Sequence, residues 1–271
     1  HGETFGIIGP DGAGKSTLFR LLTSLLVPDS GSAQVEGLDT VKDYREIRKI
    51  IGYMPGKFSL YQDLTVEENL TFFATLFGTT IDENYHLIED IYKQIEPFKA
   101  RMAGKLSGGM KQKLALCCAL IHKPKVLFLD EPTTGVDPVS RKEFWDMLGR
   151  LKNDGITILV STPYMDEAGR CDRIALIRNG KFLTVNSPAG IIAEFPDRLY
   201  SVRSDRMHAL LGDLRAYSGT ISAFSFGESV HLSTGDGFSE DDLRKFLQDR
   251  KHNNVEINAI RPSVEDCFMR I

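Results

Sequence analysis

The nine residues from Gly9 to Thr17 constrain this chain more than any other segment. They read Gly-Pro-Asp-Gly-Ala-Gly-Lys-Ser-Thr and fit the pattern G-x-x-x-x-G-K-[ST], directly after an apolar stretch that predicts a strand. Glycine permits backbone conformations closed to other residues, so successive N–H groups can surround a phosphate. The segment therefore predicts a phosphate-binding loop between a strand and a helix, which we expect over residues 16–26.

The side chains of this loop suit nucleotide binding. Lys15 is expected to reach the β- and γ-phosphates, and Ser16 to ligate Mg²⁺. All nine residues are candidate nucleotide contacts: Gly9, Pro10, Asp11, Gly12, Ala13, Gly14, Lys15, Ser16 and Thr17. A glycine-rich turn before an ordinary helix is the simpler alternative, but every fixed position of the pattern is filled and strand and helix signals flank it.

A second glycine-rich turn, Leu106-Ser107-Gly108-Gly109-Met110-Lys111-Gln112, opens an apolar helix that we expect over residues 110–121. Ser107 stands at an N-cap position, so the turn can be read as a helix cap alone. A helix N-terminus with flexible glycines is also an anion site. Because the loop at residues 9–17 already serves one nucleotide, this turn suggests contact with a second.

The apolar run Val126-Leu127-Phe128-Leu129 ends in Asp130-Glu131-Pro132. Such a run predicts a buried parallel strand that delivers two carboxylates at its C-terminal end. We expect Asp130 to hold Mg²⁺ and Glu131, the candidate catalytic base beside Lys15, to orient the water that attacks the γ-phosphate. Two solvated acids at the end of a strand remain the simpler interpretation.

With these segments the chain resembles the ATP-binding subunit of an ABC transporter. Residues 9–17 match the Walker A motif, residues 106–112 the signature, residues 126–131 Walker B, and Gly135-Val136-Asp137-Pro138 the D-loop. The resemblance implies an α/β fold of the P-loop NTPase class over residues 1–186, with a helical subdomain at about residues 57–114. It also implies that strands preceding Gly2 in the family, with an aromatic residue that stacks on adenine, are missing here.

The resemblance further implies ATP and Mg²⁺ as cofactors and two kinds of partner. A second ABC ATPase domain, in the same or another polypeptide, would receive Ser107, Gly108, Gly109 and Asp137 at its nucleotide. A membrane permease would hold the chain at the cytoplasmic face of the cell membrane. We expect the apolar loop at residues 58–64 to contact that permease; packing of these side chains under the helical subdomain is the alternative.

Two positions depart from the family pattern. Gly56 stands where a glutamine that senses Mg²⁺ and water is usual, and Pro163 stands where a histidine contacts the γ-phosphate. Proline has neither a side-chain donor nor a backbone N–H. We therefore expect slow hydrolysis of Mg-ATP. A degenerate half-site that only binds ATP in an asymmetric pair is the alternative.

Residues 187–271 are expected to form a C-terminal accessory or regulatory domain. Short segments in the order β-α-β-β-α-β, from about residue 199 to residue 260, predict a small α+β domain of ferredoxin-like type. The ending at residues 261–268, Arg-Pro-Ser-Val-Glu-Asp-Cys-Phe, resembles that of drug- and lipid-exporting ATPase subunits of the ABC-2 type. Glu265 and Asp266 also suit the start of a helix, which explains the same residues locally.

Composition excludes several classes of protein. A net charge of −4 without a sustained basic run gives no reason to expect a nucleic-acid partner. No apolar stretch approaches the ~20 residues that span a bilayer. The four cysteines lack C-x-x-C spacing, so we expect neither zinc nor disulfides. A non-transport ABC ATPase without a membrane partner, such as those that act on ribosomes, is the remaining rival, although its basic linker is not seen here.

Overall fold

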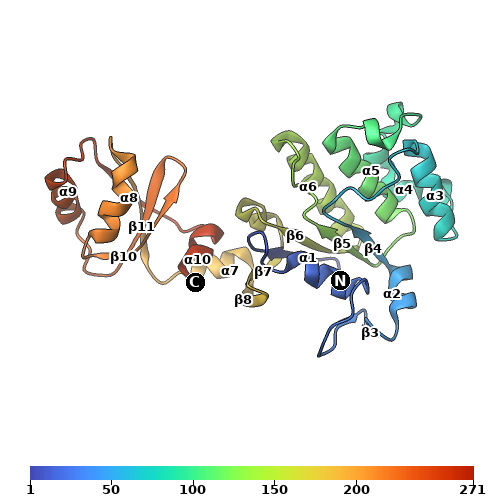
Figure 1. The fold of residues 1–271 in the computed structure, drawn as a ribbon, viewed down its shortest axis with the longest axis horizontal. Helices are drawn as coiled ribbons and strands as arrows, with labels where there is room; N and C mark the ends of the chain where they lie inside the picture. Colours follow the sequence, from blue (N-terminus) through green and yellow to red (C-terminus); the bar gives the residue numbers. More distant parts are fainter. The chain divides into compact units, whose positions relative to one another are not determined.

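Apolar segments that are far apart in the sequence pair into one six-stranded sheet (Figure 1). Neighbouring strands are parallel except for β7 and β8, which form an antiparallel hairpin. Across the sheet the order is β4 (Ile51–Met54), β5 (Val126–Asp130), β6 (Thr157–Thr162), β1 (Thr4–Ile8), β7 (Arg173–Arg178) and β8 (Lys181–Asn186). Strand β5 is buried along its whole length, which explains its uninterrupted apolar run.

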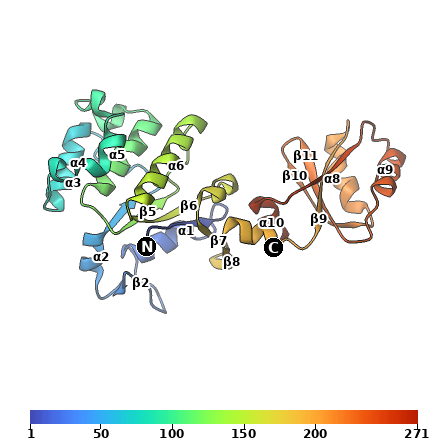
Figure 2. The same ribbon diagram turned by 180° about the vertical axis from the view of Figure 1, so that it is seen from behind.

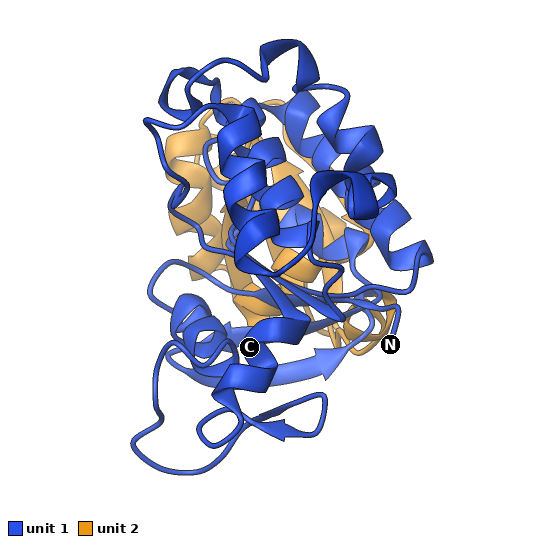
Figure 3. Cartoon of the chain, turned by 90° about the vertical axis from the view of Figure 1, so that its right-hand side faces the viewer, with its two compact units in different colours: residues 1–188 blue, residues 189–271 orange.

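The computed structural model describes residues 1–271, and these divide into two units, residues 1–188 and residues 189–271 (Figure 3). The six-stranded sheet belongs to the first unit. The other two strands of the first unit, β2 (Gln34–Val35) and β3 (Leu38–Asp39), form a separate two-stranded hairpin. The short helix α7 (Pro188–Ala193) begins at the last residue of the first unit.

Helices cover both faces of the six-stranded sheet (Figures 1 and 2). Phe19 of α1 (Lys15–Leu22) meets Phe128 of β5 edge to face, with ring centroids 5.9 Å apart. The opposite face receives α6 (Pro138–Asn153), which buries Trp145 and Leu148 among other residues. Helix α2 (Tyr44–Ile50) leads into β4.

Helix α1 ends four residues before its predicted end at residue 26. Ser24 adopts a φ of 58°, and the amides of Leu25 and Leu26 both donate to the carbonyl of Arg20. A residue of positive φ with returning hydrogen bonds is a common way for a helix to end. The apolar residues after Leu22 therefore lie outside the helix.

A helical subdomain follows β4. Its main helices are α3 (Val66–Leu76), α4 (Ile81–Tyr92) and α5 (Gly108–Leu120), with the 3₁₀ turns η1 (Glu96–Phe98) and η2 (Ala103–Lys105) between the last two. Helix α3 begins with a reciprocal capping box formed by Thr65 and Glu68. Ser107 caps α5 by accepting from the amide of Met110 at 3.3 Å.

The second unit contains a four-stranded antiparallel sheet, one face of which shares an apolar core with two of the unit's helices. In chain order the elements are β9 (Arg198–Arg203), α8 (Met207–Ala216), β10 (Thr220–Phe226), β11 (Ser229–Thr234), α9 (Glu240–Asp249), β12 (Glu256–Ile260) and α10 (Val264–Arg270). The strands lie in the order β10-β11-β9-β12, so β11 separates the two strands that α8 connects. This is the split β-α-β arrangement of ferredoxin-like sheets.

Neither unit contains a helix with both the length and the apolar character needed to cross a membrane. All four cysteines, Cys117, Cys118, Cys171 and Cys267, are buried and free.

Candidate functional site

Three loops converge at the carboxyl edge of the six-stranded sheet. Residues 9–17 follow β1, Glu131 follows β5, and Pro163 follows β6. In a parallel sheet the carboxyl ends of the strands meet at one edge, where ligands bind in α/β proteins. The two motifs that the sequence predicted from separate segments are therefore brought together here.

Close backbone packing shapes the loop at residues 9–17. A Cβ at Gly9 would lie 2.2 Å from the carbonyl oxygen of Ile177 in β7, so no larger residue fits there. Gly14 has a φ of 102°, a conformation that side chains rarely adopt. The hairpin turn between β7 and β8 supports the loop from outside, because the Gly180 amide donates to the carbonyl of Ala13 at 2.9 Å.

Lys15 lies at the centre of this site. Its side chain is only 2% exposed, and its Nζ donates to the carbonyl oxygens of Gly9 at 2.8 Å and Pro10 at 3.0 Å. The same Nζ lies 3.0 Å from Oε1 of Glu131. A buried ammonium requires such acceptors. Nucleotide phosphates are stronger acceptors than carbonyl groups and can replace part of this set.

The two carboxylates after β5 have different surroundings. Asp130 is 4% exposed, and its Oδ1 accepts a 2.6 Å hydrogen bond from the hydroxyl of Ser161 in β6. The amide of Glu131 donates to the same hydroxyl at 3.0 Å. Glu131 has a φ of 51°, which is uncommon outside glycine and asparagine and is typical of functional sites.

The residues at this edge fit a magnesium ion. Ser16 has no side-chain hydrogen bond within the protein, and Oδ2 of Asp130 accepts none, so both retain oxygen atoms for a ligand. Oxygen ligands suit Mg²⁺, which usually takes only one or two protein groups and completes its shell with phosphate and water. Accordingly, no group of three or more His, Cys, Asp or Glu side chains is placed to hold a metal.

The structure places both departures from the family pattern at this edge. A Cβ at Gly56 would lie 3.0 Å from the carbonyl oxygen of Asp130, so residue 56 packs directly against the end of β5. Pro163 immediately follows Thr162, the last residue of β6. Neither position offers a side-chain donor to a phosphate.

The signature turn at residues 106–112 lies near the D-loop and the first turn of α6 within the same chain. A Cβ at Gly109 would lie 3.1 Å from Oγ of Ser140, and Gly108 faces the carbonyl of Gly135. Asp137 caps α6 by accepting from the amides of Val139 and Ser140, and the Ser140 amide is the main cause that lowers the pKa of Asp137. No hydrogen bond or ion pair joins this turn to residues 9–17.

Sequence reasoning missed several polar side chains at this edge. Ser161, Thr162 and Thr133 are buried and hydrogen-bonded to Asp130 or Glu167. The only sequence signal for them was the presence of two hydroxyl residues directly after the apolar part of β6. Their partners are Asp130, from the neighbouring strand β5, and Glu167, from the 3₁₀ segment after β6, so that signal gave no role for them.

The sequence pattern of the family described as ABC transporter matches residues 1–134. The probable multidrug ABC transporter ATP-binding protein YbhF of Escherichia coli is 40% identical over 99% of the chain, which spans only 46% of that relative's length. The Nod factor export ATP-binding protein I of Rhizobium sp. strain N33 is 35% identical over the whole chain, which covers 88% of that relative.

Solved structures agree with these sequence matches. The cbiO1 protein from Clostridium perfringens, part of the ABC transporter complex cbiONQ, superposes with a TM-score of 0.63 at 30% identity, over 71% of this chain and 80% of its own. A bacterial ABC transporter cassette solved as a dimer gives a TM-score of 0.62 at 26% identity, over 69% of this chain and 85% of its own.

Proposed function

Because this chain belongs to the family of ABC transporter ATP-binding domains, we propose that it is the ATP-binding subunit of an exporter that binds Mg-ATP and hydrolyses it slowly. The observation that carries this proposal is the placement of Lys15 between the loop carbonyls and Glu131. The relatives named above are multidrug and Nod factor export proteins, which supports the direction of transport.

The chemistry proposed for this edge consists mainly of positioning and charge stabilisation. Lys15 and the amides of residues 9–17 hold the β- and γ-phosphates, and Glu131 orients the attacking water. Ser16 and Asp130 hold Mg²⁺, which when bound neutralises charge on the phosphates. In the structure Glu131 is paired with Lys15, and a phosphate that replaces Glu131 as the partner of Lys15 would leave the carboxylate free to face water.

A second ATPase domain completes the site in this proposal. Ser107 and Gly109 contact the nucleotide held by the partner, and Asp137 lies at the interface between the two domains. Two observations support this arrangement: no hydrogen bond or ion pair joins the signature turn to residues 9–17 of its own chain, and a related cassette was solved as a dimer. Whether the partner is another copy or a further domain of the same polypeptide does not change the chemistry.

Gly56 and Pro163 support slow turnover. At both positions the side chain that would hold the γ-phosphate or its attacking water is missing, yet Asp130, Glu131 and Lys15 are all in place. A binding-only half-site is the second candidate function, favoured by the same two positions. The retained Glu131 favours hydrolysis over binding alone.

The helical subdomain presents an apolar surface suited to a membrane permease. Tyr61, Phe72 and Leu76 are exposed, and the rings of Tyr61 and Phe72 pack edge to face at 4.9 Å. Leu60 of the same loop is buried, so only part of the loop at residues 58–64 packs inward. Docking here would hold the chain at the cytoplasmic face of the membrane, while residues 189–271 serve as an accessory or regulatory domain.

The test compares nucleotide affinity with turnover in the wild-type chain and in Glu131→Gln, alone and with the permease complex. We expect ATP to bind both proteins and turnover to fall about 100-fold or more in the variant, since a base contributes 10²–10⁴-fold. Because Glu131→Gln removes the ion pair between Lys15 and Glu131, the affinity for ATP should stay equal or rise. Binding with turnover indifferent to the substitution would establish the binding-only half-site, and absence of nucleotide binding would overturn the proposal.

A further inference from the structure

Glu167 is a buried carboxylate that the proposed chemistry does not use. It lies in the 3₁₀ segment η3 (Met165–Arg170) and is 3% exposed. Its Oε1 accepts a 2.8 Å hydrogen bond from the hydroxyl of Thr133, and its Oε2 accepts a 2.6 Å hydrogen bond from the hydroxyl of Thr162. Burying a carboxylate costs free energy unless its oxygens accept hydrogen bonds, and these two hydroxyls supply one bond to each oxygen.

The two hydroxyls come from different loops of the nucleotide site. Thr133 lies two residues after Glu131. Thr162 ends β6, and its hydroxyl also accepts from the amide of Tyr164 at 3.0 Å, which fixes the backbone on both sides of Pro163. The carbonyl of Thr162 in turn accepts from the amide of Gly9 at 3.3 Å.

A third segment joins through Arg141 of α6. Its Nε lies 3.7 Å from Oε1 of Glu167, and its guanidinium lies over the ring of Tyr164 at 4.2 Å from the centroid. Helix α6 begins at Pro138, directly after its N-cap Asp137 in the D-loop. Glu167 and its neighbours therefore contact the segment after β5, the segment after β6, and the helix that starts at the D-loop.

We propose that Glu167 is a positioning residue that fixes the segment at residues 162–164 relative to Glu131 and to α6; this inference rests on the proposed function. Pro163 has no hydrogen-bond donor, so a hydrogen bond from this residue to a phosphate cannot fix its position. The position of this segment therefore depends on Thr162 and Tyr164, and through them on Glu167. With an amide in place of the carboxylate, the group at one of the two positions is a donor instead of an acceptor, so one hydroxyl must reverse its hydrogen bond, and the charge that faces Arg141 is removed.

The test uses Glu167→Gln with Asp166→Asn as a matched control. Asp166 is the adjacent residue and lies 3.9 Å from the same arginine, but it is largely exposed and contacts neither threonine. We expect Glu167→Gln to lower kcat about tenfold while the KM for ATP and the affinity for Mg-ADP stay within about twofold, because misplacement of a catalytic group affects the chemical step. Asp166→Asn should match the wild type in every measurement.

Hydrogen exchange in the nucleotide-free protein supplies a readout that does not depend on turnover. In Glu167→Gln the amides of residues 133–136 and of residues 162 and 164 should exchange faster together, whereas amides of β1 should not change. A response in only one of the two segments, or a uniform loss of protection with kcat unchanged, would overturn the inference. The exchange rates can be measured even if the chain binds no nucleotide. Failure to bind nucleotide would overturn the proposed function and leave this inference to be judged by the exchange rates.

If Glu167→Gln fails to fold, the pair Thr162→Val and Thr162→Ser replaces it. Valine keeps the shape of threonine but cannot donate to Oε2, whereas serine keeps the hydroxyl. We expect the kcat defect with valine and its recovery with serine. Equal turnover in the two variants would overturn the inference.

Discussion

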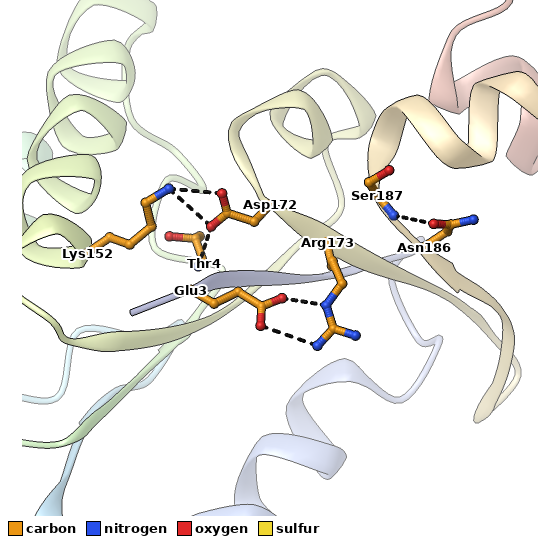
Figure 4. Close-up of polar contacts among 7 residues, drawn as sticks. All are labelled: Glu3, Thr4, Lys152, Asp172, Arg173, Asn186 and Ser187. Atoms are coloured by element: carbon orange, nitrogen blue, oxygen red, sulfur yellow. Dashed lines mark hydrogen bonds and ion pairs between the residues drawn. The ribbon is translucent and has the colours of Figure 1, made fainter. Parts of the chain in front are cut away.

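The two edges of the six-stranded sheet use charged residues in different ways. At the amino edge, Arg173 donates to Glu3 at 2.6 Å, while Asp172 accepts from Lys152 and from the amide of Thr4, both at 2.9 Å (Figure 4). Each of these charged side chains forms an ion pair with another side chain of the protein near the surface. None of them needs a ligand as a partner.

At the carboxyl edge the charges are buried and their partners are exchangeable. Lys15 is held by two carbonyls and a carboxylate, and Asp130 keeps one oxygen without a hydrogen bond. Glu131 adopts a backbone conformation that is unfavourable for its residue type. The difference teaches that burial combined with an incomplete or replaceable partner set, rather than the number of ion pairs, marks the edge that binds a ligand.

The largest effect expected from this comparison is that of Lys15→Ala. The substitution removes the buried ammonium, and with it charge-assisted hydrogen bonds that are together expected to change nucleotide affinity by about 100-fold. Isothermal titration with Mg-ADP measures this directly. If affinity falls by less than about threefold, Lys15 is not a phosphate ligand and the contrast between the edges fails.

Gly9→Ala tests whether the carboxyl edge depends on close packing of the backbone. The added Cβ would lie 2.2 Å from a carbonyl oxygen of β7, so loop and strand must separate. We expect nucleotide affinity to fall about tenfold and the free energy of unfolding to fall by about 2 kcal/mol. Titration and denaturant unfolding measure the two effects.

Gly149→Ala is the matched control for this substitution. Gly149 lies inside α6 with nothing within 4 Å of an added Cβ, so alanine should leave affinity unchanged and raise stability slightly. Equal losses in both variants would show that the close approach at Gly9 has no special importance.

Pro163→His sharpens the comparison by adding a donor at the carboxyl edge. A histidine here can reach the γ-phosphate, and we expect turnover in the assembled complex to rise about tenfold, a modest share of what a positioned acid or base supplies. Affinity for Mg-ADP, which lacks the γ-phosphate, should not change. Unchanged turnover would mean that the missing donor does not limit the reaction.

The smallest effect is expected at the amino edge, from Asp172→Asn. Burial alone would raise the pKa of Asp172, but the Thr4 amide and Lys152 outweigh it and lower the pKa. A lowered pKa in the folded state gives stability that is present at neutral pH and is lost as pH falls below about 4. We therefore expect a loss of about 1 kcal/mol or less at pH 7, with unchanged nucleotide affinity.

Thermal unfolding of wild type and Asp172→Asn across the acid range checks that prediction. The two curves should converge as pH falls, because the wild-type carboxylate becomes protonated and loses its advantage. A difference that grows toward low pH would contradict the assigned sign. A loss of nucleotide binding would contradict the separation of the two edges.

Local features were predictable where the interacting groups are close in the sequence. The cap of Ser107 at the start of α5 lies where the sequence predicted it. The polar end of strand β6, in contrast, depends on residues elsewhere in the chain. Ser161 and Thr162 are polar and ended the apolar pattern, yet both are buried, because Asp130 and Glu167 accept their hydroxyl hydrogens.

The sequence by itself determined the ABC-type family and the residues that compose the nucleotide motifs, because glycine spacing, strand hydrophobicity and cap residues act over a few neighbouring positions. Only the tertiary structure decided that Lys15 pairs with Glu131, that residue 177 makes Gly9 obligatory, and that Glu167 joins Thr133 to Thr162. These contacts connect residues brought together by parallel strand pairing and by burial. The free energy of those contacts depends on distance in the folded chain, which spacing in the sequence does not encode.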